Sequence, residues 1–133
     1  MEELAALGTV TARSPVISTA PMGPSARRYA NAAVVLETEL DPQALLAALQ
    51  WTEREFGRKR WRRWGDRVLD LDIVMWSGGS FAAPGLVVPH PAFDQRGFVL
   101  GPASTIAPAW RDPNTGLTLQ HAKARLTRKR PLP

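Results

Sequence analysis

The chain has 133 residues, a net charge of +5 at pH 7 and no cysteine. This length suits one domain. Hydrophobic residues make up 44% of the chain and charged residues 22%, which is ordinary composition for a globular protein and argues against a disordered chain. The lack of cysteine excludes disulfides, zinc–thiolate sites and thiol catalysis, and no apolar run approaches the roughly 20 residues of a membrane span. The positive charge predicts an anionic partner, either nucleic acid or nucleotide phosphates, and the cytoplasm is the expected compartment.

Hydrophobic periodicity and turn residues divide the first half of the chain into two strands and two helical segments. Asp41 and Pro42 are typical of a helix start, as N-cap and first helical residue, and Gly57 is typical of a helix end. The expected elements are a helix end over 1–7 capped by Gly8, a strand over 9–20 interrupted near Pro15, a strand over 29–40, and a helix from Pro42 to Gly57.

The second half mixes short strands, turns and helices without regular alternation, which favours an α+β fold. We expect one domain over 1–127 and a basic tail over 128–133. The expected elements are a basic loop over 58–65, a strand over 68–76, a turn over 77–80, a strand over 86–88, a short helix within 92–106, a turn over 112–116 and a last helix from Thr118 to Arg125.

Two aspartates on the predicted strand over 68–76 form the first candidate site. Asp70 and Asp72 face one side of this strand, while Leu69 and Leu71 face the other, because strand side chains alternate. Paired carboxylates repel each other, and magnesium, which takes one or two carboxylates plus water and phosphate oxygens, removes that repulsion. On spacing alone, a solvated acidic edge strand is the commoner outcome.

Cationic residues and tryptophans directly precede the two aspartates. Guanidinium groups bind phosphate oxygens bidentately, so a basic loop beside paired carboxylates suits a nucleotide with bound magnesium. A nucleic-acid surface with tryptophan stacking is the alternative, but it does not account for the carboxylates. The residues are Arg58, Lys59, Arg60, Trp61, Arg62, Arg63, Trp64 and Arg67.

Further candidate side chains stand singly or in pairs two residues apart. His90, held between two prolines, could contact a phosphate, although a structural turn histidine is the commoner role. The pairs are Tyr29 with Asn31, and Arg96 with Phe98. Two distant histidines and no cysteine argue against a nucleophile triad.

Several segments, in this order, resemble one family, 6-hydroxymethyl-7,8-dihydropterin pyrophosphokinase, an enzyme of folate biosynthesis. The resemblance runs from about Leu7 to Leu119 and implies a ferredoxin-like α+β fold. It also implies transfer of the diphosphate of ATP to the hydroxymethyl oxygen of the pterin, with release of AMP. The segments are Y-A-N-A-A-V over 29–34, Gly57-Arg58, R-W-G-D-R-V-L-D-L-D-I over 63–73, V-P-H-P over 88–91, R-G-F-V-L-G-P over 96–102 and I-A-P over 106–108.

The same resemblance implies a role for each matching residue, and it implies a monomer. Asp70 and Asp72 would hold two magnesium ions that bridge the ATP phosphates. The phosphate-contacting residues would be Arg58, Arg67, His90 and Arg96, and the other nucleotide contacts would be Gln50, Glu53, Arg60, Trp64 and Ile73. The residues of the pterin pocket would be Tyr29 and Phe98 as stacking rings, Asn31 at the pterin edge, and Thr19, Pro21 and Met22 in a lining loop.

Some features depart from the family pattern. Family members begin with a strand that carries a G-S-N-type turn and leads into a helix, whereas this chain begins at the end of that helix. The first, central strand of the sheet is therefore expected to be missing. The basic loop is one residue shorter, Asp66 replaces a proline, and Ala103 and Thr105 replace a leucine and a glutamate. The alternative function is a catalytically weak relative that binds nucleotide or nucleic acid without turnover.

Overall fold

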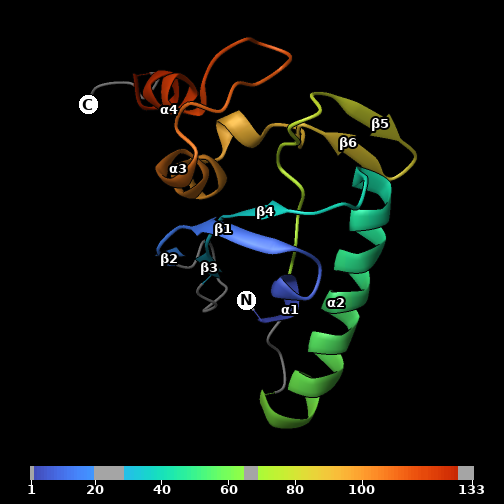
Figure 1. The fold of residues 1–133 in the computed structure, drawn as a ribbon. Coiled ribbons are helices and arrows are strands. Elements are labelled where there is room, and N and C mark those ends of the chain that lie inside the picture. Colours follow the sequence, from blue (N-terminus) through green and yellow to red (C-terminus); the bar gives the residue numbers. More distant parts are fainter. Residues whose placement is uncertain (1, 20–28, 65–68, 129–133) are drawn as a thin grey trace. The chain divides into compact units, whose positions relative to one another are not determined.

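The computed structural model describes residues 2–19, 29–64 and 69–128. Helices and two-stranded antiparallel pairs make up the described chain, which confirms the predicted α+β class (Figure 1). The chain divides into two compact units: Met1–Thr9 with Thr38–Pro91, and Val10–Glu37 with Ala92–Pro133. Among the described residues, none of the helices combines the length and apolar character that crossing a bilayer requires.

The first unit is built on one long helix. A short helix, α1 (Glu2–Ala5), precedes it, and α2 runs over Pro42–Trp64. The predicted start of α2 is confirmed, because the Asp41 carboxylate accepts a hydrogen bond of 2.8 Å from the Ala44 N–H. Leu4 and Leu49 are buried in this unit, and the Thr38 hydroxyl donates to the Leu7 carbonyl at 2.9 Å.

The predicted end of α2 at Gly57 is wrong, and so is the predicted loop that follows it. The helix continues without interruption to Trp64 (Figure 1). Gly57 does not adopt the positive φ that would make it a helix cap, unlike Gly79 at φ 103°. The arginine, lysine and tryptophan residues that follow tolerate a helix well, so that one glycine does not stop it.

The segment over 69–75 is not part of a strand ladder, so the predicted strand over 68–76 is wrong for the described residues. A strand needs a hydrogen-bonded neighbour, and no described segment pairs with this one. The segment is instead tied at two points. The Leu71 N–H donates to the Glu53 carboxylate at 2.7 Å, and the His90 N–H donates to the Val74 carbonyl at 2.8 Å.

A small hairpin completes the first unit. The predicted turn over 77–80 is confirmed, since Trp76 and Gly79 form an isolated antiparallel bridge. Two strands follow: β5 (Phe81–Ala83), which sequence analysis missed, and the expected β6 (Leu86–Val88), paired antiparallel with Phe81 opposite Val88. Phe81 also meets the Trp76 ring edge-on at 6.2 Å, and Val88 is only 1% exposed.

Strand pairs open the second unit. The predicted strand over 9–20 forms β1 (Thr9–Arg13) and β2 (Ile17–Thr19), and the predicted strand over 29–40 forms β3 (Tyr29–Asn31) and β4 (Val34–Glu37). β1 neighbours β4, and β2 neighbours β3. Buried Ser14 lies between β1 and β2, and it is hydrogen-bonded to Ala33, which lies between β3 and β4. Its N–H donates to the Ala33 carbonyl at 2.8 Å, and its Oγ accepts from the Ala33 N–H at 2.9 Å.

Helices supply the core of the second unit. The predicted helix within 92–106 is confirmed as the 3₁₀ turn η1 (Phe93–Gln95) and α3 (Gly97–Ile106), and α3 packs against η1 and α4 (Leu119–Arg128). Thr118 caps α4 as predicted, by accepting from the His121 N–H at 3.2 Å, but the helix runs three residues beyond the expected Arg125. The buried residues of this core are Phe93, Leu100, Ala103, Leu119 and Ala122.

A turn links α3 to α4. The predicted turn over 112–116 is confirmed, because buried Asp112 accepts from the Asn114 N–H at 2.9 Å and from the Thr115 hydroxyl at 3.0 Å. Pro21 and Met22 of the expected lining loop and the end of the basic tail, 129–133, lie outside the described residues. The expected domain boundary at residue 127 stays a prediction.

Gly57 and Gly79 differ in backbone conformation, so substitution by alanine should change the free energy of unfolding in opposite directions at the two positions. A methyl group added at either Gly57 or Gly79 meets nothing within 4 Å, so packing is unchanged in both variants. Gly57→Ala should raise the free energy of unfolding by about 0.5–1 kcal/mol, because alanine favours a helix interior. Gly79→Ala should lower it by about 1–2 kcal/mol, because φ 103° strains any other residue. Urea unfolding of both variants tests this: a less stable Gly57→Ala would contradict the continuous helix, and a more stable Gly79→Ala would contradict the strain at φ 103°.

Candidate functional site

One face of α2 carries four of the predicted nucleotide contacts. Positions 50, 53, 60 and 64 are separated by three, seven and four residues. Because an α-helix has 3.6 residues per turn, these positions lie along the same side of α2. Gln50 is exposed and Glu53 is half-buried, while the side chains of Arg60 and Trp64 lie outside the described residues. The uninterrupted helix thus aligns residues that a loop would not have aligned.

The two aspartates lie beside this helix. Asp70 and Asp72 are exposed, whereas Leu69, Leu71 and Ile73 are half-buried, so the segment alternates as a strand would despite having no ladder. The hydrogen bond from the Leu71 N–H to Glu53 attaches the residue between the aspartates to α2. Two solvent-facing carboxylates in this arrangement suit a magnesium ion that completes its shell with water and phosphate oxygens.

His90 belongs to the same unit and is bonded to the same segment. Its backbone N–H donates to the Val74 carbonyl at 2.8 Å, and its Nδ1 lies 3.0 Å from the Pro91 carbonyl oxygen. Hydrogen bonds therefore join three features of the predicted nucleotide site within one unit: Glu53 on α2, the aspartate segment, and His90. Ile73 lies half-buried between the two hydrogen-bonded positions.

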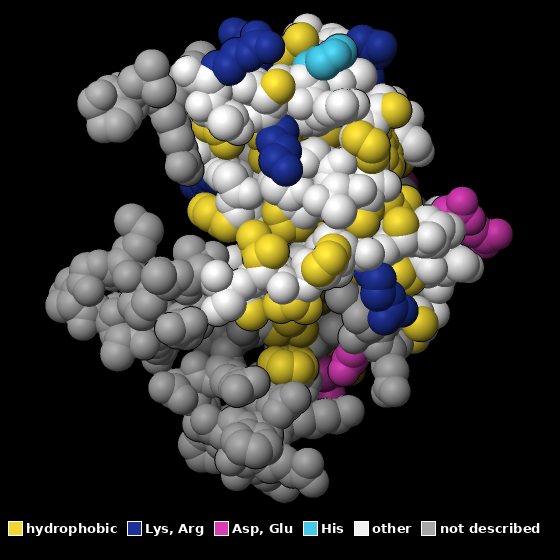
Figure 2. Space-filling view, turned by 90° about the vertical axis from the view of Figure 1, so that its left-hand side faces the viewer, with side chains coloured by type: hydrophobic (Ala, Val, Ile, Leu, Met, Phe, Trp, Pro, Cys, Tyr) yellow, Lys and Arg dark blue, Asp and Glu magenta, His cyan; other side chains and the backbone are white. Residues whose placement is uncertain are grey.

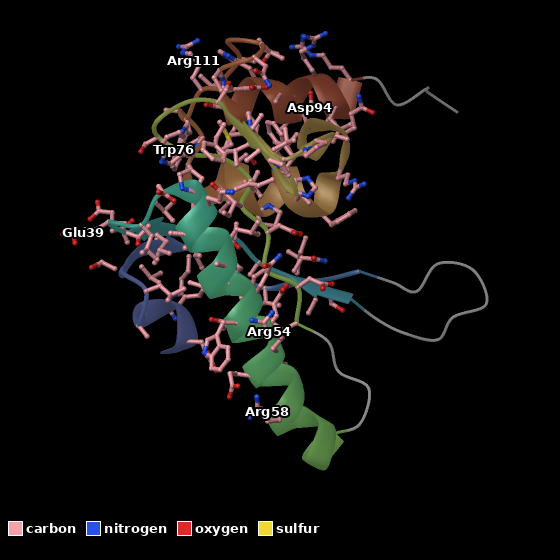
Figure 3. The ribbon with its side chains drawn as sticks, turned by 90° about the vertical axis from the view of Figure 1, so that its right-hand side faces the viewer. Glu39, Arg54, Arg58, Trp76, Asp94 and Arg111 are labelled. Atoms are coloured by element: carbon pink, nitrogen blue, oxygen red, sulfur yellow. The ribbon has the colours of Figure 1, made fainter. Side chains whose placement is uncertain are left out.

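Two side-chain contacts along α2 were missed by sequence analysis. Arg58 lies 2.8 Å from the Glu55 carboxylate as an i, i+3 ion pair, and the Arg54 guanidinium lies 5.9 Å from the centre of the Trp51 ring. Figure 3 shows Arg54 and Arg58 about one turn apart on α2. The predicted helix end at Gly57 placed Arg58 outside the helix, so its i, i+3 relation to Glu55 was not recognised. Arg58 is 70% exposed, so this pair is weak and phosphate can compete for the guanidinium.

The predicted pterin residues lie in the second unit. In the β2–β3 ladder, Thr19 is opposite Tyr29 and Ile17 is opposite Asn31. The helix α3, which carries Phe98 in its first turn, lies against both strands, and the Phe98 side chain is 43% exposed. An exposed aromatic ring, here on a helix that lies against a short ladder, is the type of surface on which a flat heterocycle stacks.

Of the remaining predicted site residues, one lies in the second unit and three are outside the described residues. Arg96 is exposed and occupies the N-cap position of α3, in the second unit. Arg67, Pro21 and Met22 lie outside the described residues, so the structure does not test their predicted contacts.

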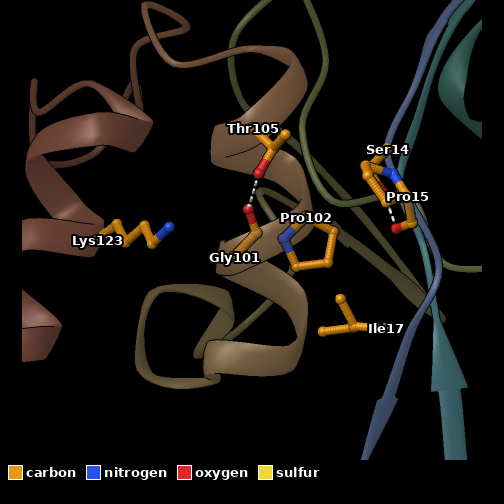
Figure 4. Close-up of a pocket in the computed structure, with 7 residues that line it drawn as sticks. All are labelled: Ser14, Pro15, Ile17, Gly101, Pro102, Thr105 and Lys123. Carbon is orange, nitrogen blue, oxygen red and sulfur yellow. Dashed lines mark hydrogen bonds between the residues drawn. The ribbon is translucent and has the colours of Figure 1, made fainter.

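A pocket of about 210 Å³ opens between the α3 helix and the β1–β2 connection of the second unit. Figure 4 shows the Lys123 side chain extending from α4 toward Gly101 of α3. None of the lining residues is a predicted pterin contact, although Ile17 is the ladder partner of Asn31. The lining residues are Ser14, Pro15, Ile17, Gly101, Pro102, Thr105 and Lys123.

Positive charge extends from the predicted basic tail into α4. The described part of this helix contains Lys123, Arg125 and Arg128 but no acidic residue. Lys and Arg side chains accordingly stand at the α4 end of the face shown in Figure 2. This surface accounts for part of the net charge without involving the aspartate segment.

The comparisons with known proteins identify one family. A family model described as 7,8-dihydro-6-hydroxymethylpterin-pyrophosphokinase matches residues 1–108. The 2-amino-4-hydroxy-6-hydroxymethyldihydropteridine pyrophosphokinase of Synechocystis sp. is 41% identical over 97 residues, which cover 73% of this chain and 50% of the relative. The protein of the same name from Pseudomonas aeruginosa is 42% identical over 106 residues, which cover 79% and 65%.

A plant relative places the same region within a longer protein. The "Folate synthesis bifunctional protein, mitochondrial" of Arabidopsis thaliana is 40% identical over 94 residues, which cover 70% of this chain and 17% of the relative. The chain spans about half the length of the Synechocystis relative and 65% of that from Pseudomonas aeruginosa.

Proposed function

The chain belongs to the 7,8-dihydro-6-hydroxymethylpterin-pyrophosphokinase family, and we propose that its protein transfers the diphosphate of ATP to 6-hydroxymethyl-7,8-dihydropterin. In this reaction the hydroxymethyl oxygen of the pterin attacks the β-phosphorus of ATP. The bond between the β-phosphorus and the oxygen that bridges it to the α-phosphate breaks, so AMP leaves with that oxygen. The hydroxyl proton passes to solvent. The observation that carries this proposal is the exposed Asp70–Asp72 pair, hydrogen-bonded through Leu71 to the helix face that bears Gln50 and Glu53. The product is a pterin diphosphate for folate biosynthesis.

The nucleotide half of the proposed site lies largely in the first unit. Asp70 and Asp72 would hold two magnesium ions, which would neutralise the phosphate charge and polarise the β-phosphorus. Diphosphoryl transfer requires positioning and charge stabilisation rather than a protein nucleophile, which agrees with the absence of cysteine. The proposed phosphate ligands are Arg58, Arg67, His90 and Arg96, and the proposed nucleotide contacts are Gln50, Glu53, Arg60, Trp64 and Ile73.

The pterin half of the proposed site lies in the second unit. We expect Tyr29 and Phe98 to stack on the pterin ring and Asn31 to hydrogen-bond its polar edge. Thr19, Pro21 and Met22 would line the pocket. The exposure of Phe98 and the position of α3 beside β2 and β3 support this assignment. We further propose that the protein acts as a monomer in the cytoplasm.

The proposed activity predicts that AMP forms only when both substrates are present. Purified protein with Mg²⁺ and ATP should release AMP and pterin diphosphate in equal amounts after 6-hydroxymethyl-7,8-dihydropterin is added. Chromatographic quantification of AMP with and without the pterin measures this. Nucleotide binding without pterin-dependent AMP would contradict the proposal and favour a binding protein that does not turn over.

Removal of one proposed metal ligand should abolish turnover. Asp72→Ala should lower kcat/KM by about 100-fold or more, because a transition-state charge contact is lost. Asp94→Ala, in η1 of the second unit, is the matched control and should retain near-normal activity. Near-normal transfer by Asp72→Ala would contradict the metal assignment, and circular dichroism of both variants checks that they remain folded.

A further inference from the structure

The hydrogen bond between α2 and the aspartate segment joins a charged acceptor to a backbone donor. The Glu53 Oε2 atom lies 2.7 Å from the Leu71 nitrogen, at a partly buried position. A carboxylate that accepts a backbone N–H forms one of the stronger hydrogen bonds in proteins. Leu71 is the residue between Asp70 and Asp72, so this bond holds the midpoint of the pair.

The absence of a ladder makes this contact more important. In a sheet, backbone hydrogen bonds on both sides fix where each side chain points, but residues 69–75 have no strand neighbour within the described chain. Two hydrogen bonds hold the segment in its unit: the Leu71 N–H donates to Glu53 at 2.7 Å, and the Val74 carbonyl accepts from the His90 N–H at 2.8 Å. The Val74 contact comes two residues after Asp72, so Leu71 is the contact that lies within the pair.

We propose that Glu53 is a positioning residue that sets the direction and spacing of the Asp70 and Asp72 carboxylates. This inference rests on the proposed function, and it gives Glu53 a second role beside the proposed nucleotide contact. One oxygen of Glu53 binds the Leu71 N–H, which leaves the other oxygen for solvent or ligand. Glu53 would therefore influence a bound metal ion through the backbone between the two aspartates.

Amide exchange tests the contact without any need for turnover. The Leu71 amide should exchange with solvent about tenfold faster or more in Glu53→Ala, because a hydrogen bond to a charged acceptor is lost. Glu53→Gln keeps an oxygen that can accept the N–H, so it should restore much of the protection. Glu39→Ala is the control, since Glu39 is an exposed glutamate near the start of α2 in the same unit (Figure 3). Unchanged Leu71 exchange in Glu53→Ala would overturn the proposal.

Metal titration tests the consequence for the aspartates. With ATP present and pterin omitted, Mn²⁺ broadening of the Asp70 and Asp72 amide signals reports divalent-ion binding. Glu53→Ala should need about tenfold more Mn²⁺ for half-maximal broadening, while Glu53→Gln and Glu39→Ala should remain within about threefold of the wild type.

Two results would separate a positioning role from the alternatives. If Glu53→Ala raised only the KM for ATP and left the Mn²⁺ titration unchanged, Glu53 would be a nucleotide contact alone and the positioning role would be wrong. If the exchange and Mn²⁺ results held but the wild type formed no pterin-dependent AMP, the positioning role would stand and the proposed function would fail.

Discussion

The continuity of α2 through Gly57 is the constraint on which the candidate nucleotide site depends. A helix that ended at Gly57 would leave the following basic residues in a loop with no defined direction. The continuous helix instead places positions 50, 53, 60 and 64 on one face across 23 residues of regular structure. Regular helix geometry is a more rigid support for phosphate and metal contacts than a loop.

The aspartate segment shows how a site can be ordered without complete secondary structure. Asp70 and Asp72 alternate with half-buried neighbours as in a strand, but a glutamate side chain and one backbone contact replace the ladder. Side chains that satisfy backbone donors are common at helix ends and turns, and here the same chemistry acts at the centre of the candidate metal site. The acidic pair is thus coupled to α2 by a side chain that also carries negative charge.

The predicted contact residues are divided between the two compact units. The first unit holds the aspartates, His90 and the α2 face, while the second holds the pterin candidates on β2, β3 and α3. Arg96 is the exception, because it is a predicted phosphate contact at the start of α3 in the second unit.

The helix start at Asp41, the turns, the α+β class and the family could be predicted from sequence, because they depend on local backbone preferences and short ordered motifs. The alternation of residues also indicated Asp70 and Asp72 as a pair with a common direction. The end of α2 and the contacts that hold the aspartates depend on tertiary structure. Local propensity does not reveal whether a glycine adopts positive φ, and the Glu53–Leu71 hydrogen bond joins residues 18 positions apart.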